Sequence, residues 1–173
     1  VLAKGDEAGS FTLSAGSTIN TTGEAGDAGG TITIETASQN PDGGGATDAD
    51  ITINGDLITS GGTASSSVGL AGGSVSLETN DSGVITFGSG ADITTTGSAG
   101  NGSTNAGGAG GTVTLNTNNA TITLNDTTIN TSGGSGAGGG AQGAGGTITI
   151  SDPVTLATDT VTLDTGASAG GVE

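Results

Sequence analysis

The sequence predicts an all-β chain that folds as a right-handed parallel β-helix of about five coils, each made of three short strands. One observation is a phrase opened by two glycines, which returns at 29–37, 72–80, 110–118 and 145–153. Within this phrase, apolar residues alternate with threonine or serine, which is the period-two pattern of a strand with one buried face. A third observation is that no segment shows a helical period.

Aligning the copies divides the chain into repeat units at 11–50, 51–83, 84–120, 121–153 and 154–173, the last of which is incomplete. A unit this short cannot bury its few apolar side chains alone, whereas stacked units share one continuous core. Each strand would then pair in parallel with its counterpart in the next unit, about 4.8 Å away. Parallel crossovers are right-handed as a general rule. We therefore expect residues 1–173 to form a single β-solenoid segment.

Each unit holds three strands in the same order. The first strands are expected at 11–15, 51–55, 84–88, 121–125 and 154–158, and the second strands at 17–23, 56–62, 91–97, 127–133 and 160–166. The third strand is the recurring phrase. Its alternation directs one set of side chains inward, namely Ile32, Ile34, Val75, Leu77, Val113, Leu115, Ile148 and Ile150.

Glycine-rich segments separate the second and third strands, at 23–30, 61–73, 97–111 and 133–146. Their different lengths explain the uneven spacing of the copies, because insertions in a solenoid collect at one corner. Such segments either stay flexible or stack as extended, polyproline-like chains, and the sequence leaves both open. Disorder of the whole chain is the competing interpretation for a glycine-rich acidic sequence. The regularly placed β-branched residues favour a folded chain.

The amino-acid composition limits the classes of partner that the chain can bind. The 173 residues include 38 glycines and two phenylalanines but no His, Cys, Met, Trp or Tyr, so a thin aliphatic core is expected. Seventeen acidic residues face one cation, Lys4, and the net charge of -16 disfavours nucleic acid and anionic lipid. No apolar stretch approaches the ~20 residues of a membrane span, so no membrane insertion is expected. The natural partners are divalent cations and neutral sugars.

The phrases "GGTVTLNT" at 110–117 and "ATITLNDTTINTSGG" at 120–134 resemble the repeat regions of large secreted bacterial surface proteins. These are the filamentous-haemagglutinin-like and autotransporter-type β-helical adhesins, and the resemblance covers essentially the whole chain. It implies export, an extracellular or cell-surface location in a bacterium, and a rod-like stalk that serves adhesion or a matrix.

The two ends of the sequence fit each other. Residues 1–10 show no strand partner of their own, but residues 168–173 written before them read as two glycines followed by a third strand. Val172 and Val1 would face inward on either side of an outward Glu173. We therefore expect copies to join end to end, as tandem repeats or as subunits, through Val1, Leu2, Val172 and Glu173, because uncapped coils expose unpaired backbone. An arbitrary segment boundary is the alternative.

Catalysis is not expected. Asp48 and Asp50 could share a proton or flank a bond, but nothing in the composition would orient a polymer or stabilise developing negative charge. The acidic stretch 41–50, with Asp42, Asp48 and Asp50, is the candidate metal site, and Ca²⁺ is the candidate ion because it takes many oxygen ligands. No cofactor is required. Solvated carboxylates that keep the protein in solution are the competing interpretation.

Two outward ladders complete the candidate sites. Equivalent outward positions on successive coils are occupied by Glu35, Glu78, Asn116 and Ser151, with Asp164 on a neighbouring strand face. The repulsion between Glu35 and Glu78 favours a bridging cation. The alternative is stacking of polar side chains without metal. Threonines and serines form the second ladder, at Thr31, Thr33, Ser74, Ser76, Thr112, Thr114, Thr147 and Thr149.

The chain is therefore expected to be a non-catalytic structural segment of an extracellular filament, sheath or adhesin stalk. It would stack end to end with copies of itself, and divalent cations would bridge the acidic surfaces. The alternative is an ice-binding or carbohydrate-binding β-helix that uses the outward threonine ladder, with surface glycans as partners. Threonine also occurs there simply because it is a polar β-branched strand former.

Overall fold

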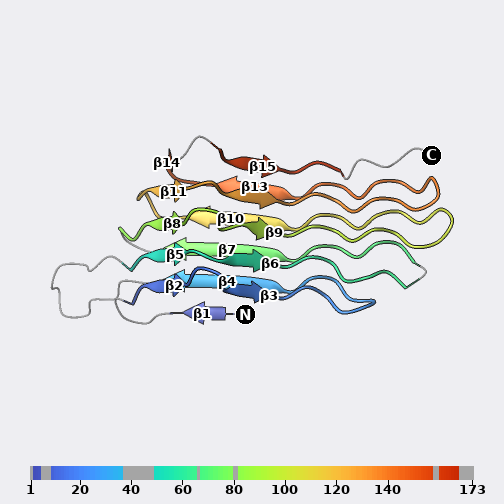
Figure 1. Cartoon of the computed structure of the whole chain (residues 1–173), viewed down its shortest axis with the longest axis horizontal. Coiled ribbons are helices and arrows are strands. Elements are labelled where there is room, and N and C mark those ends of the chain that lie inside the picture. The colour runs from blue at the N-terminus through green and yellow to red at the C-terminus, as the bar shows by residue number, and fades with distance from the viewer. Residues whose placement is uncertain are drawn as a thin grey trace.

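The computed structural model describes residues 2–4, 9–36, 49–65, 67–79, 82–157 and 160–167, and its strands form three parallel sheets of five strands each (Figure 1). Sheet A contains β1 (Leu2–Lys4), β4 (Thr31–Thr36), β7 (Ser74–Thr79), β10 (Thr112–Asn116) and β13 (Thr147–Ile150). Sheet B contains β2 (Phe11–Leu13), β5 (Ile51–Ile53), β8 (Ile85–Phe87), β11 (Ile122–Leu124) and β14 (Val154–Leu156). Sheet C contains β3 (Thr18–Asn20), β6 (Asp56–Ile58), β9 (Ile93–Thr94), β12 (Thr128–Asn130) and β15 (Thr162–Asp164).

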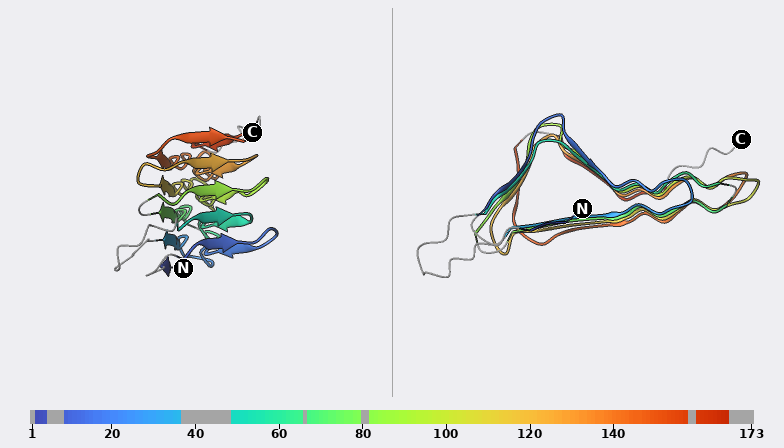
Figure 2. Two further views of the ribbon diagram at one scale, coloured as in Figure 1. Left: turned by 90° about the vertical axis from the view of Figure 1, so that its left-hand side faces the viewer. Right: turned by 90° about the horizontal axis from the view of Figure 1, so that it is seen from below.

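The chain visits sheets A, B and C in turn, so that each coil encloses a triangular section (Figure 2). Seen from the N-terminal end, it runs clockwise as it recedes towards the C-terminus, which is the right-handed sense (Figure 2). The predicted right-handed parallel β-helix with three strands per coil is confirmed. About four turns of the chain connect the five strands of each sheet. The described residues contain no helix, and hence none long and apolar enough to cross a membrane.

The core lies inside the triangle and consists of aliphatic columns. Ile32, Val75, Val113 and Ile148 follow one another in register across sheet A, and the inward parity predicted from the sequence is confirmed. The inward side chains of the middle coils are fully buried, with Phe87 as the largest. The outermost coils are less protected, because Phe11, Leu13, Ile19, Ile148 and Ile150 are only partly buried.

Between sheets C and A, each of the first four coils extends into a pair of glycine-rich legs that stack into a thin plate (Figures 1 and 2). We call this plate the Gly-rich slab. It comprises residues 21–30, 59–73 without residue 66, 95–111 and 131–146. The leg that leaves sheet C is the outgoing leg, and the leg that leads into sheet A is the returning leg.

Hydrogen bonds with a period of three residues hold the slab together. Between the outgoing legs of the first and second coils, Gly23 N donates to Ser60 O at 3.0 Å. Three residues further along each of these legs, Gly26 N donates to Thr63 O at 3.1 Å. Threefold periodicity is that of a polyproline II helix, which makes no hydrogen bonds within its own chain. Other amides bond across the slab, as Gly30 N of the returning leg does to Thr21 O at 2.7 Å. The structure thus decides the question that the sequence leaves open, in favour of stacked polyproline-like legs.

Glycine is required in the slab because the legs touch through their backbones. A Cβ atom at Gly73 would overlap the carbonyl oxygen of Gly30, and one at Gly111 would overlap that of Gly73. These glycines stand at the same place in successive coils, directly before the third strand. The two glycines that open each recurring phrase therefore allow close approach of neighbouring coils.

One expectation about the N-terminal residues is wrong. Residues 1–10 were expected to lack a strand partner of their own, yet β1 pairs in parallel with β4, with Leu2 opposite Thr33. The segment 2–4 thus takes the third-strand place in sheet A, one coil below β4.

Candidate functional site

The predicted threonine and serine ladder lies on the outer face of sheet A. Thr31, Ser74, Thr112 and Thr147 form one column, and Thr33, Ser76, Thr114 and Thr149 form the second. Thr31 Oγ1 and Ser74 Oγ lie 3.3 Å apart, so a hydroxyl pair links the first two rungs. Thr31, Thr112, Thr147 and Thr149 are exposed, and the other four residues are half-buried. The sequence thus predicted both columns and their register.

A further threonine column on sheet B escaped the sequence analysis. Thr12, Thr52, Thr86, Thr123 and Thr155 are the middle residues of five strands and stand in register across the sheet. The signal was present, because every first strand reads as apolar, threonine, apolar. Each strand contributes only one outward residue, however, so no alternation drew attention to the column.

The predicted carboxylate ladder is a column on sheet A, beside the threonine columns. Glu35 stands in register with Glu78, and Glu78 with Asn116. Lys4 stands in register with Glu35 on the other side. Asp164 lies on sheet C opposite Asn130, and Ser151 follows β13 with its amide bonded to Leu115 O at 3.2 Å. The structure therefore brings Glu35 and Glu78 together and leaves Asp164 on another sheet.

Of the acidic stretch 41–50, only Asp50 falls within the described residues, whereas Asp42 and Asp48 lie outside them. Asp50 Oδ1 accepts a hydrogen bond of 2.9 Å from Val84 N in the next coil. Asp92 Oδ1 makes the same kind of bond with Thr128 N at 2.7 Å. These carboxylates join successive coils. Over the described part of the chain, no three Asp, Glu, His or Cys side chains gather closely enough to hold a metal ion.

Asp152 organises a turn that the sequence analysis did not single out. Its Oδ2 accepts a bond of 2.6 Å from Thr117 N, and its Oδ1 one of 2.9 Å from Asn119 N. Asn118 and Asn119 have φ values of 49° and 81°, in the left-handed region that asparagine tolerates. The Thr117 bond lowers the pKa of Asp152, desolvation opposes this, and the Asn119 bond adds to the lowering.

The two ends of the stack differ from its middle. Val154, Leu156 and Leu163 on the last coil are 42%, 59% and 51% exposed, although equivalent side chains in the middle coils are buried. Of the predicted end-to-end residues, Leu2 lies in β1 at the opposite end of sheet A. Val1, Val172 and Glu173 lie outside the described residues.

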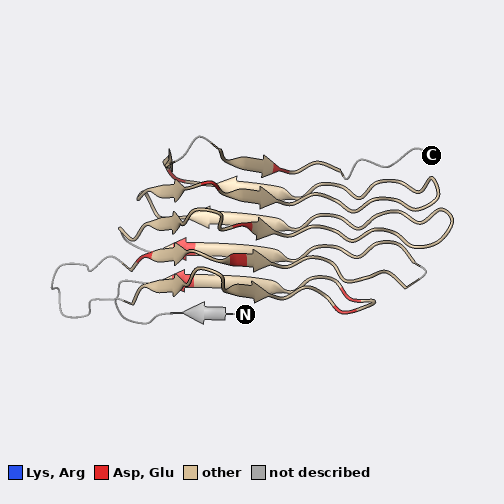
Figure 3. Ribbon diagram, viewed as in Figure 1, with Lys and Arg blue, Asp and Glu red and all other residues tan. Residues whose placement is uncertain are grey.

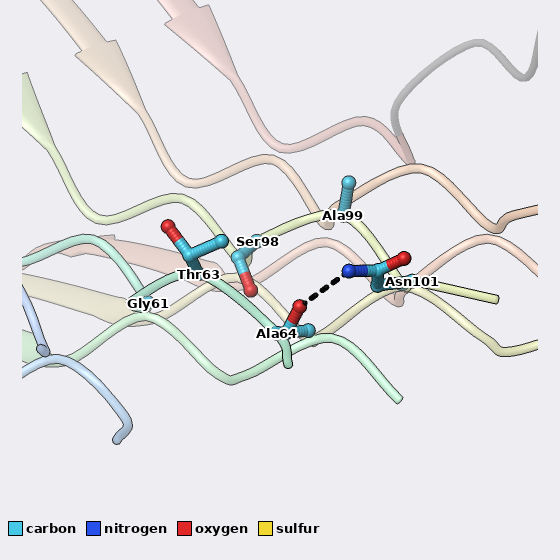
Figure 4. A pocket seen from close by; sticks show the side chains of 7 residues that line it. Gly61, Thr63, Ala64, Ser98, Ala99 and Asn101 are labelled. Carbon is cyan, nitrogen blue, oxygen red and sulfur yellow. Dashed lines mark hydrogen bonds between the residues drawn. The ribbon is translucent and has the colours of Figure 1, made fainter. Parts of the chain in front are cut away.

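Two adjacent hollows open on the outgoing legs. The first measures about 370 Å³ and lies between the second and third coils, where Asn101 Nδ2 donates to Ala64 O at 2.9 Å (Figure 4). The second measures about 610 Å³ and extends from Thr96 past Asn130 to Asp164. Ala99 lines both hollows. The sequence analysis missed them, because they depend on how legs of unequal length lie side by side.

No family model, no curated protein and no solved structure matches this chain.

Proposed function

We propose that the chain is a non-catalytic structural segment of an extracellular filament, sheath or adhesin stalk that stacks end to end with copies of itself. The observation that carries this proposal is the unbroken hydrogen bonding along the solenoid axis. Every sheet pairs five strands in parallel, and the slab adds further bonds between the same coils. A force that pulls or bends the solenoid would be distributed over many parallel hydrogen bonds, and this makes such a stack stiff.

The resemblance of the repeats to haemagglutinin-like and autotransporter-type adhesins supports a location at the surface of a bacterium. The exposed Val154, Leu156 and Leu163 support stacking, because a following coil would cover them as the inner coils cover Ile85, Leu124 and Ile129. Burial of such side chains contributes roughly 1.5–3 kcal/mol each. Stacking would also pair the strand edges at the end of the solenoid.

Electron microscopy of concentrated protein tests this proposal. We expect filaments in which each copy adds about 24 Å, the height of five coils at the spacing of parallel strands. The double variant Leu156→Glu/Leu163→Glu places two charges on the end face and should leave monomers. Thr155→Glu/Thr162→Glu adds the same charge to the outer faces of the same strands and should still form filaments. Monomers of the unaltered protein at high concentration would refute the proposal.

Divalent cations would act between filaments. The net charge of -16 on each copy would keep neighbouring filaments apart, and Glu35 beside Glu78 repeats once per segment on an outer face. We expect millimolar Ca²⁺ to bundle the filaments and a chelator to reverse the bundling, measured by light scattering. Equal bundling of a Glu35→Gln/Glu78→Gln variant would exclude this pair as the bridge.

Ice binding is the second candidate, and the paired columns of sheet A favour it. Two columns of four hydroxyl-bearing residues lie in register on one face. A thermal hysteresis assay tests it, with Thr114→Lys as the disruptive variant and Thr162→Lys on sheet C as its control. Carbohydrate binding by the same columns would appear as glycan binding that Thr114→Lys abolishes.

A further inference from the structure

The two hollows on the outgoing legs form one trough that runs along the solenoid axis. Ala99 lines both hollows. Gly61 and Thr63 lie at one end of the trough, and Asp164 lies at the other end. The trough therefore spans the second to the fifth coil, which are about 4.8 Å apart at each step. Combined, the hollows reach the size of an ordinary small-molecule site, but in an elongated and open form.

Apart from Asp164 at its last coil, the trough lies on a part of the molecule that carries no charged side chain. The segments 59–73, 95–111 and 131–146 contain no Asp, Glu, Lys or Arg, whereas the rest of the chain carries the charge of -16. Figure 3 shows acidic residues in the slab only on the lowest coil. An anionic ligand would be repelled by the molecule as a whole, and a cationic one would prefer the acidic faces. A neutral ligand meets neither difficulty.

Polar groups line the wider hollow at intervals that follow the coils. Asn130 Oδ1 accepts bonds of 2.9 Å and 2.7 Å from the amide and hydroxyl of Ser132, which fixes the orientation of its amide group. Asp164 Oδ1 accepts a bond of 2.9 Å from Gly166 N, which leaves Oδ2 to accept from a ligand hydroxyl. Carboxylate, carboxamide and hydroxyl groups together both donate and accept, as a polyhydroxylated ligand requires.

Glycines form part of the floor of the trough. Gly97, Gly133 and Gly134 line the wider hollow, and a Cβ at each of them would overlap a backbone carbonyl oxygen of a neighbouring leg, so these glycines allow the legs of the floor to pack closely. A linear polymer with hydroxyl groups at regular intervals could repeat its contacts from coil to coil, since a sugar ring with its linkage is about as long as the coil spacing.

From this arrangement we propose that the trough binds a neutral, linear polysaccharide segment that lies along the solenoid axis. The site differs from the threonine columns on sheet A, and the proposal does not depend on end-to-end stacking. Because no aromatic residue lines either hollow, sugar rings cannot stack there, and we expect a single segment to bind weakly.

Titration monitored by ¹H–¹⁵N NMR tests the proposal on the unaltered chain. The probes are hexamers of β-1,4-glucose, β-1,3-glucose, β-1,4-mannose and β-1,4-xylose, with hexagalacturonate as the anionic comparison. At least one neutral hexamer should shift amide signals in 97–101 and 132–135 while leaving those in 107–111 unchanged, and hexagalacturonate should shift none of them. No shift from any neutral hexamer, or equal shifts from the anionic one, would overturn the proposal.

Two matched variants locate the site. Ala99→Leu fills the shared wall of the two hollows and should raise the Kd at least about tenfold. Ala109→Leu places the same side chain on an exposed alanine of the returning leg and should leave the Kd unchanged. Both variants should keep the spectrum of the folded chain, which shows that any loss is local. Equal Kd values for the two variants would rule out the trough.

Discussion

Thr79 and Thr95 show that two buried threonine hydroxyls can have different energetic roles. Both side chains are fully buried. Thr79 Oγ1 donates to Gly83 O at 2.5 Å, whereas Thr95 Oγ1 has no partner within the described structure. Its counterpart one coil further on, Thr131 Oγ1, reaches Asp164 O only at 3.4 Å. Thr95 therefore contributes to the fold through its shape and β-branching and not through a hydrogen bond of its hydroxyl.

This difference predicts opposite effects of the same substitution. Thr95→Val removes an unpaired hydroxyl and should leave the free energy of unfolding unchanged or raise it by up to about 1 kcal/mol. Thr79→Val leaves the Gly83 carbonyl unpaired and should lower it by about 1–3 kcal/mol. Urea denaturation of the two variants measures both values. A larger loss for Thr95→Val than for Thr79→Val would contradict this assignment.

Asp152 predicts a pH dependence. Its pKa is lowered in the folded chain from the ordinary value of 3.8, chiefly by the hydrogen bond from Thr117 N. A lowered pKa means that its contribution is fully present above the unfolded value and is lost as the pH falls through the folded value. Asp152→Ala should therefore be less stable than the unaltered chain near neutral pH, and the difference should shrink below about pH 4. Thermal unfolding from pH 7 to pH 3 would reveal a constant difference if this reasoning were wrong.

At the scale of the element, strand parity was predictable and the slab was not. Ile32 and Ile34 alternate with threonines, and this local pattern determines which face is buried whatever lies beside it. Gly23, Gly26 and Gly29 also follow a period, of three residues, but a flexible loop could carry the same glycines. Whether they stack depends on partners in the next coil, such as Ser60 and Thr63, which lie far away in sequence.

The candidate sites divide in the same way. The columns through Thr31 and Thr33 follow from the alignment of the repeats, because parallel pairing brings equivalent residues into register. The bond from Val84 N to Asp50 could not be predicted, since it depends on the corner geometry between coils. The hollows beside Ala99 depend on the relative height of neighbouring legs, about which local sequence carries no information.

The slab predicts a strong sensitivity to added methyl groups. Gly73→Ala places a Cβ where the Gly30 carbonyl lies and should lower the free energy of unfolding by about 1–3 kcal/mol, the usual range for overpacking. Ala71→Val adds more atoms two residues earlier, but on an exposed side chain, and should cost less than about 0.5 kcal/mol. Chemical denaturation compares the two. Similar stabilities would mean that the legs are not in contact at Gly73.

At the scale of the whole molecule, core and slab act as one stack of coils. A single segment is wider in the plane of its coils than along the solenoid axis (Figure 1), so a rod arises only when many coils are stacked. The triangular section supplies the buried aliphatic columns. The slab adds hydrogen bonds but little apolar burial, and its second to fourth coils present an uncharged surface beside the acidic outer faces of the triangular section. This division suits the proposed stalk, which would resist bending and display a neutral face.

The slab continues the hydrogen-bonded stack of the three sheets, and amide hydrogen exchange measures this continuity directly. Gly72 N and Gly110 N bond to the next coil and Gly73 N and Gly111 N bond across the slab, whereas Ala71 N and Ala109 N have no acceptor among the described residues. We predict a period of three, in which the glycine amides exchange as slowly as those of the core strands and the alanine amides exchange rapidly. Uniformly fast exchange throughout 59–73 and 95–111 would show flexible loops and contradict the account.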